Sequence, residues 1–107
     1  MDERRKFERI NLPSSAQVFA EKSNGERLGE VVVLGRGGML VNTDKNFPPD
    51  TKLTLHLVDN SEGIRREVQA VTRYKLPEGM GFEFEQLDPD AAVEIGVIIG
   101  KYYSAVQ

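Results

Sequence analysis

Most of the chain alternates short apolar runs with clusters of turn-forming residues, a pattern typical of β-strands joined by hairpins. Leu53, Leu55 and Leu57, for example, alternate with polar residues and so share one face of a strand. The pattern predicts strands over residues 16–20, 27–34, 39–41, 52–58, 64–74 and 81–85. About six strands spaced by turns predict a mostly β chain folded as a small antiparallel barrel.

Glycine, asparagine and proline mark the connections between these strands. Asn24-Gly25 tolerates positive φ and is a strong hairpin signal. Pro48-Pro49-Asp50 and Pro77-Glu78-Gly79 are typical of a loop and a turn. Gly35-Arg36-Gly37-Gly38 separates two apolar runs and predicts a further break between strands.

Only the end of the chain has the spacing of a helix, predicted over residues 88–103. Asp88 is a good N-cap, and Pro89 suits the first helical position. Gly96 and Gly100 each weaken a helix by about 1 kcal/mol relative to alanine, which indicates close packing on a sheet or fraying. The helix is expected to cover an open end or an edge of the barrel, through an apolar stripe of Ala92, Ile95, Ile99 and Tyr102.

The chain has 107 residues, which predicts a single domain over residues 1–107. We divide it into a flexible, arginine-bearing arm (1–12), the barrel (13–87) and the helix (88–103). The 14 Lys and Arg against 17 Asp and Glu give a net charge of -3, which argues against a general nucleic-acid binder.

Several features that the sequence lacks bear on where the protein is located and on whether it is an enzyme. No run approaches the roughly 18 apolar residues of a membrane span, and the charged start does not resemble a secretory signal. Cysteine is absent, which is compatible with a reducing cytoplasm. His56 is the one histidine, and no acid/base, nucleophile or metal-ligand spacing surrounds it. We therefore expect a cytoplasmic protein that is neither an enzyme nor a metal binder, with His56 as a structural residue.

The first candidate site is the arm, which carries Arg4, Arg5 and Arg9. A guanidinium group presents a planar fork of donors that suits phosphate and the O6/N7 edge of guanine. An arm with two such forks is able to close over a ligand on the barrel. The alternative is a solvated tail in which Glu3 and Glu8 partly neutralise the arginines.

The second candidate site is the loop that contains Gly35, Arg36 and Gly38. Its glycines permit positive φ and allow a ligand to approach the backbone closely. The alternative is a tight hairpin or bulge with no ligand. The flanking strands and the lack of a following Gly-Lys-[Ser/Thr] exclude a KH-type RNA clamp and a nucleotide P-loop.

Together, the arm and the loop make the chain resemble the PilZ family. The arm matches the family signature R-x-x-x-R at Arg5-Lys6-Phe7-Glu8-Arg9, and Arg4 matches an arginine often found before it. The second signature, [D/N]-x-S-x-x-G, is met only at Gly38, because Val33 stands in place of Asp or Asn and Gly35 in place of Ser. The resemblance covers nearly the whole chain and implies a bacterial six-stranded antiparallel β-barrel with one C-terminal α-helix.

The resemblance also implies a ligand, the second messenger cyclic di-GMP, and an output through a protein partner. The ligand-binding residues would be Arg4, Arg5, Arg9, Gly35, Arg36 and Gly38, with Arg36 as the candidate to replace the lost loop contacts. No other cofactor, nucleic acid or membrane insertion is expected. Two alternatives stay open: a degenerate PilZ domain that has lost the nucleotide and acts as a protein–protein adaptor, and a generic OB- or SH3-like barrel.

Overall fold

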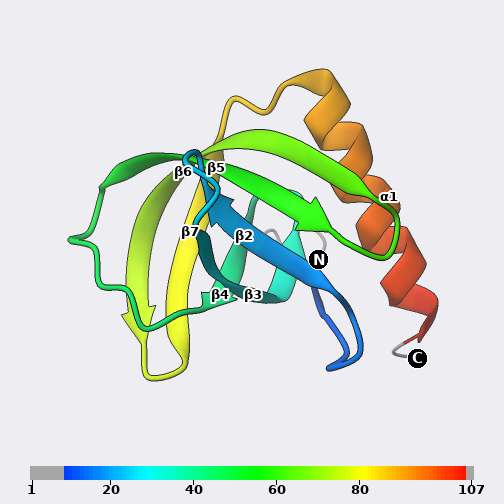
Figure 1. Cartoon of the computed structure of the whole chain (residues 1–107), viewed down its shortest axis with the longest axis horizontal. Coiled ribbons are helices and arrows are strands. Elements are labelled where there is room, and N and C mark those ends of the chain that lie inside the picture. The colour runs from blue at the N-terminus through cyan, green and yellow to red at the C-terminus, as the bar shows by residue number, and fades with distance from the viewer. Residues whose placement is uncertain (1–8, 106–107) are drawn as a thin grey trace, which may run out of the picture.

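The computed structural model describes residues 9–105 as one antiparallel sheet that closes into a barrel, with a helix along one side (Figure 1). A long loop between two of the strands, over residues 43–51, projects on the side away from the helix. The helix is α1 (Pro89–Ala105). The strands are β1 (Arg9–Asn11), β2 (Val18–Lys22), β3 (Arg27–Gly35), β4 (Gly38–Asn42), β5 (Lys52–Asp59), β6 (Ile64–Leu76) and β7 (Gly79–Glu85).

The barrel closes where β3 pairs with β4. The strand order is β1-β3-β2-β5-β6-β7-β4, and the additional β3–β4 pairing joins β2 through β7 into a ring of six strands. β2 pairs with the first half of β3, up to Glu30, and β1 pairs with its last three residues, Val33–Gly35. The predicted mostly β fold, a six-stranded barrel with one C-terminal helix, is confirmed.

Strand β1 corrects the predicted boundary of the flexible arm. Residues 1–12 were expected to be flexible, but Arg9–Asn11 pair antiparallel with β3. The cause is Ile10, which is only 6% exposed and lies opposite the fully buried Leu34. A strand of three residues is too short for an alternating pattern to reveal it. Residues 1–8 lie outside the described part of the chain.

Helix α1 begins at Pro89, and the amide of Ala92 donates to the carbonyl of Asp88 at 2.9 Å, as a start after Asp88 requires. The predicted apolar stripe is correct for Ile95 and Ile99 and wrong for Ala92, which is exposed. Ala91 lies in the core instead, because one residue rotates the position by about 100° around a helix. No helix in residues 9–105 is long and apolar enough to span a bilayer.

The core lies between the inner face of the barrel and the buried face of α1. The alternating leucines of β5 contribute as predicted, because Leu55 and Leu57 are essentially inaccessible and Leu53 packs at the edge. From α1, Ile95 and Ile98 are fully buried in the same cluster. The helix therefore caps the barrel through apolar packing, and this fixes its position relative to β1 and β3.

An ion pair fastens the second half of α1 to the end of β5. The Nζ of Lys101 donates to Oδ2 of the fully buried Asp59 at 3.0 Å, to Oγ of Ser61 at 2.8 Å and to Oε2 of Glu62 at 3.2 Å. Burial alone lowers the pKa of Lys101, but its hydrogen bonds to Asp59 and Glu62 outweigh that effect and raise the pKa above its ordinary value.

Candidate ligand-binding site

Strand β1 brings the arm and the glycine loop together. Arg9 lies directly opposite Gly35 in the antiparallel pairing of β1 with β3. Ile10, the next residue, points into the core, so the exposed Arg9 points outward. Directly opposed residues of an antiparallel pair share a face. The guanidinium of Arg9 is therefore carried on the outer surface of the barrel, next to the position where β3 ends.

A row of small and apolar residues crosses this outer surface beside Arg9. Val33 of β3 lies opposite Leu40 of β4, and Leu40 lies opposite Gly81 of β7. Val33 and Leu40 are half-buried. Tyr74 of β6 pairs with Gly81, and its ring lies so close that any Cβ at Gly81 would overlap it. The row is thus a flat apolar floor that ends at an aromatic ring, 49% exposed at Tyr74.

Gly38 has a packing role in this region. It pairs with Glu83 of β7, and a Cβ at Gly38 would overlap the carbonyl of Phe82. The amide of Phe84 also donates to the carbonyl of Gly37 at 2.9 Å. The backbone of the loop is thus held tightly against β7, and the close approach of two strands is enough to require glycine at position 38.

An ion-pair network borders the same region on β6 and β7. Arg73 donates through Nε to Oε1 of Glu83 and through Nη1 to Oδ1 of Asp50, both at 2.6 Å. The hydrogen bond to Glu83 is the main cause that raises the pKa of Arg73. Glu83, which faces outward next to Gly38, is therefore paired with a cation rather than left as a bare negative charge.

Arg36 reaches toward the helix. It is exposed, and a Cβ at Gly96 of α1 would stand 3.7 Å from its Nη2 and 3.9 Å from its Cζ. Gly96 therefore leaves room for the guanidinium to lie over the helix. The contact joins the glycine loop to α1, and the role of Arg36 toward a phosphate stays a prediction.

The remaining predicted arginines, Arg4 and Arg5, lie outside the described residues. Arg9, Gly35, Arg36 and Gly38 all lie where β1, β3 and β4 meet. A groove with a volume of about 340 Å³ lies elsewhere, between residues 65–69 of β6 and residues 86–88. Arg9, Gly35, Arg36 and Gly38 do not line it, and they lie instead around the outer surface of β1, β3 and β4.

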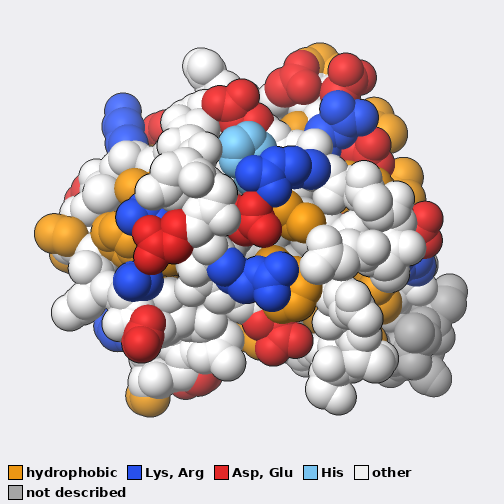
Figure 2. Space-filling model, viewed as in Figure 1, with side chains coloured by type: hydrophobic (Ala, Val, Ile, Leu, Met, Phe, Trp, Pro, Cys, Tyr) orange, Lys and Arg blue, Asp and Glu red, His pale blue; other side chains and the backbone are white. Residues whose placement is uncertain are grey.

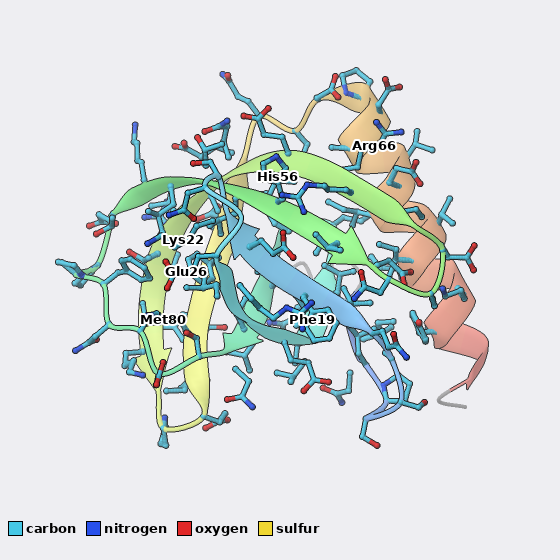
Figure 3. The ribbon with its side chains drawn as sticks, in the orientation of Figure 1. Phe19, Lys22, Glu26, His56, Arg66 and Met80 are labelled. Atoms are coloured by element: carbon cyan, nitrogen blue, oxygen red, sulfur yellow. The ribbon has the colours of Figure 1, made fainter. Side chains whose placement is uncertain are left out.

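His56 lies away from this surface, on the outer face of β5 between Glu21 of β2 and Glu67 of β6 (Figure 3). Basic and acidic side chains are interleaved over the face that Figure 2 shows, with no large patch of one sign. Among residues 9–105, no three His, Cys, Asp or Glu side chains gather to hold a metal ion.

Arg66, beside α1 in Figure 3, donates to Oε2 of Glu94 at 3.0 Å and so joins β6 to the helix.

The family model described as PilZ domain matches residues 3–100. The chain belongs to the PilZ family. PilZ domains are binding and adaptor modules, and the family is generally one of cyclic di-GMP receptors. A comparison with curated proteins finds no match.

The two departures from the second PilZ signature fall on the candidate surface. Val33 and Gly35 are the opposed partners of Asn11 and Arg9, so a side chain at either position lies on the same face as its partner, although the glycine itself is buried. A carboxylate or amide at position 33 and a hydroxyl at position 35 would therefore stand beside Arg9. The surface keeps its arginine and has lost two polar groups of β3.

Two residues of this surface were missed by the sequence analysis: Asn11 and Tyr74. In the sequence, Asn11 belongs to the polar arm, and Tyr74 stands at the end of a long predicted strand. Only the pairings of β1 with β3 and of β6 with β7 bring them to this surface, Asn11 opposite Val33 and Tyr74 opposite Gly81. Tyr74 lies two residues after the buried Thr72 and opposite Gly81, so its place on this surface can be recognised once the strand register is known.

Proposed function

We propose that this PilZ domain is a cyclic di-GMP receptor that signals through a protein partner. The observation that supports it best is the pairing of Arg9 with Gly35, which joins the R-x-x-x-R arm to the second motif on one outer surface. Arg9 and Arg5 would grip guanine and phosphate, and Arg4 would add charge. Gly38 allows the close approach of β4 to β7, and Arg36, which reaches toward Gly96, would meet a phosphate at the side near α1.

The chemistry of the surface suits a planar, anionic ligand. Arginine makes bidentate contacts with the O6/N7 edge of guanine and with phosphate oxygens. Bases stack on aromatic and apolar side chains without steric conflict where the neighbours are small. Val33, Leu40 and the ring of Tyr74 offer such a floor next to Arg9. A guanine on that floor would present its edge to the arginine.

The expected affinity depends on the polar side chains of the second PilZ signature that are missing at Val33 and Gly35. A good bidentate base contact is worth about 1–3 kcal/mol, and a neutral hydrogen bond about 0.5–1.5 kcal/mol. Losing both weakens binding by roughly 1.5–4.5 kcal/mol, or about 10- to 1000-fold, relative to a site with the intact signature. We therefore expect micromolar rather than tighter binding.

Calorimetric titration of cyclic di-GMP into the purified domain tests the proposal, with GTP as the specificity control. The wild-type domain should bind saturably at micromolar concentration, and Arg9→Ala should abolish the heat. Arg27→Ala is the matched control, because Arg27 lies at the other end of β3 and its Cζ stacks 3.7 Å from the centre of the Phe19 ring. Folded protein that gives no heat at its highest soluble concentration would contradict the receptor function.

A second function, a protein–protein adaptor without nucleotide, is favoured by the outer face of α1. Val93 is 64% exposed and Val97 52% exposed, and Tyr103 adds an exposed ring on the same helix. Val93 and Val97 are one helical turn apart and so form one continuous apolar strip, and contiguous apolar surface marks contact sites for proteins. If nucleotide binding fails, a partner that the wild type retains and Val97→Asp loses would establish the adaptor function.

A further inference from the structure

We infer that Asn11 supplies from β1 the base-edge hydrogen bonds that Val33 is unable to supply from β3. The inference rests on the proposed cyclic di-GMP site and assigns a specificity residue to it. Asn11 stands directly opposite Val33, the position where the second PilZ signature has Asp or Asn. A polar group lost from one strand is thus present on its neighbour.

The hydrogen bonding of β1 brings these two side chains close together. The amide of Leu12 donates to the carbonyl of Val32 at 2.9 Å, so Leu12 and Val32 form a hydrogen-bonded pair. Opposed pairs in an antiparallel ladder alternate between hydrogen-bonded and non-hydrogen-bonded types. Asn11 and Val33 therefore form a non-hydrogen-bonded pair, in which the Cα atoms are about 4.5 Å apart and the side chains lie closer.

Asn11 also lies on the same face as Arg9. Both are exposed, and the buried Ile10 separates them along β1. Residues two apart on a strand are about 7 Å from each other, a spacing at which two side chains reach one base or a base and its phosphate. A base stacked over Val33 and Leu40 would have Arg9 and Asn11 along one edge.

The amide group has the chemistry that this place requires. Its oxygen accepts, and its nitrogen donates twice, so it can accept from the N1–H of guanine and donate to the adjacent O6. A carboxylate at the same place accepts only and so matches the donors of guanine better than the ring nitrogens of adenine. Asn11 therefore predicts a site that binds guanine but separates it from adenine less sharply than a carboxylate would.

The strand itself gains nothing from this residue. Asparagine is depleted in β-strands because it fits a pleated surface poorly, whereas Thr or Val is favoured. β1 has only three residues, and Asn11 occupies one of its two exposed positions. Replacing Asn11 should accordingly leave the fold intact, which makes the test clean.

The test titrates cyclic di-GMP and cyclic di-AMP into the wild-type domain, Asn11→Ala and Asn11→Asp. The matched control is Asn42→Ala, an exposed asparagine at the end of β4. We expect Asn11→Ala to weaken cyclic di-GMP binding about 3- to 10-fold and Asn42→Ala to leave it unchanged. Asn11→Asp should retain cyclic di-GMP and increase its preference over cyclic di-AMP.

A rescue experiment separates a binding role from a structural one. Val33→Asp should strengthen cyclic di-GMP binding more in the Asn11→Ala background than in the wild type, because the two positions serve the same base edge. If the wild type binds and Arg9→Ala weakens binding, but Asn11→Ala binds as the wild type does, the inference is overturned and the receptor function stands. If the wild type does not bind, the receptor function fails, and the inference fails with it.

Discussion

The guanidinium of Arg36 lies over Gly96 of α1, so the loop that follows β3 contacts the helix across the end of the barrel. The same loop is held on its other side by β1, where Arg9 pairs with Gly35. The candidate ligand surface and the helix are therefore joined through consecutive loop residues. A displacement of the backbone at Gly35 would move Arg36, which contacts α1 at Gly96. The outer face of the same helix carries the exposed Val93 and Val97.

Gly96 should tolerate alanine but not a large side chain. A Cβ would meet Arg36 at 3.7 Å, an ordinary contact, and alanine favours a helix by about 1 kcal/mol over glycine. Gly96→Ala should therefore raise the free energy of unfolding, by up to about 1 kcal/mol, whereas Gly96→Leu should displace Arg36. Urea denaturation measures both. Destabilisation by Gly96→Ala would show that α1 packs more tightly on the loop than the structure has it.

Gly38 and Gly100 should respond to alanine in opposite directions. A Cβ at Gly38 would overlap the Phe82 carbonyl, while nothing lies within 4 Å of one at Gly100. Gly38→Ala should lower the free energy of unfolding by about 1–3 kcal/mol through forced backbone shifts. Gly100→Ala should raise it by about 1 kcal/mol through helix propensity. Equal stability of the two variants would refute the packing role of Gly38.

Removal of Lys101 should destabilise the domain by leaving Asp59 buried without its cation. Breaking a fully buried pair costs about 3–5 kcal/mol, and the partial exposure of Lys101 reduces this to about 2–4 kcal/mol for Lys101→Met. Asp59→Asn added to Lys101→Met should recover part of the loss. Thermal or urea unfolding of the single and double variants measures the coupling. Additive effects would mean that the pair does not stabilise the attachment of α1.

The same ion pair predicts a pH dependence in the alkaline range. The pKa of Lys101 is raised in the folded state above its ordinary value of 10.5. Its contribution is therefore fully present below pH 10.5 and is lost as the pH rises above that value toward the folded pKa. The free energy of unfolding should fall more steeply above pH 10.5 in the wild type than in Lys101→Met. Parallel curves for the two proteins would contradict the assignment.

Much of the barrel could be predicted from local pattern. The alternation in β5 and the Asn24-Gly25 turn depend on neighbouring residues, and both predictions hold. β1 could not be predicted, because three residues carry no period and Ile10 is buried by its distant partner Leu34. The error at Ala92 has a similar origin, because Ala91 and Ala92 are alike in the sequence and only the packing of α1 on the barrel decides that Ala91 is the buried one.

The candidate site could be predicted only in part, because the sequence does not show the register in which the strands pair. Arg9, Gly35 and Gly38 stand out as residue types, but spacing along the chain does not say that Arg9 pairs with Gly35. Asn11 and Tyr74 have no local signal at all, because their place beside Val33 and Gly81 follows from strand pairing. The contact of Arg36 with Gly96 likewise depends on where α1 packs.

The most direct measurement is a titration of the ¹⁵N-labelled domain with cyclic di-GMP, followed through its backbone amide signals. The account predicts saturable shifts concentrated in Arg9–Leu12 and in residues 33–40, with Tyr74 and Gly81 next. The amides of the β2–β3 turn at Gly25 and of the β5–β6 turn at Gly63 should stay unchanged. Absent shifts, or shifts centred on residues 65–69 and 86–88, would contradict a receptor site built on Arg9 and Gly35.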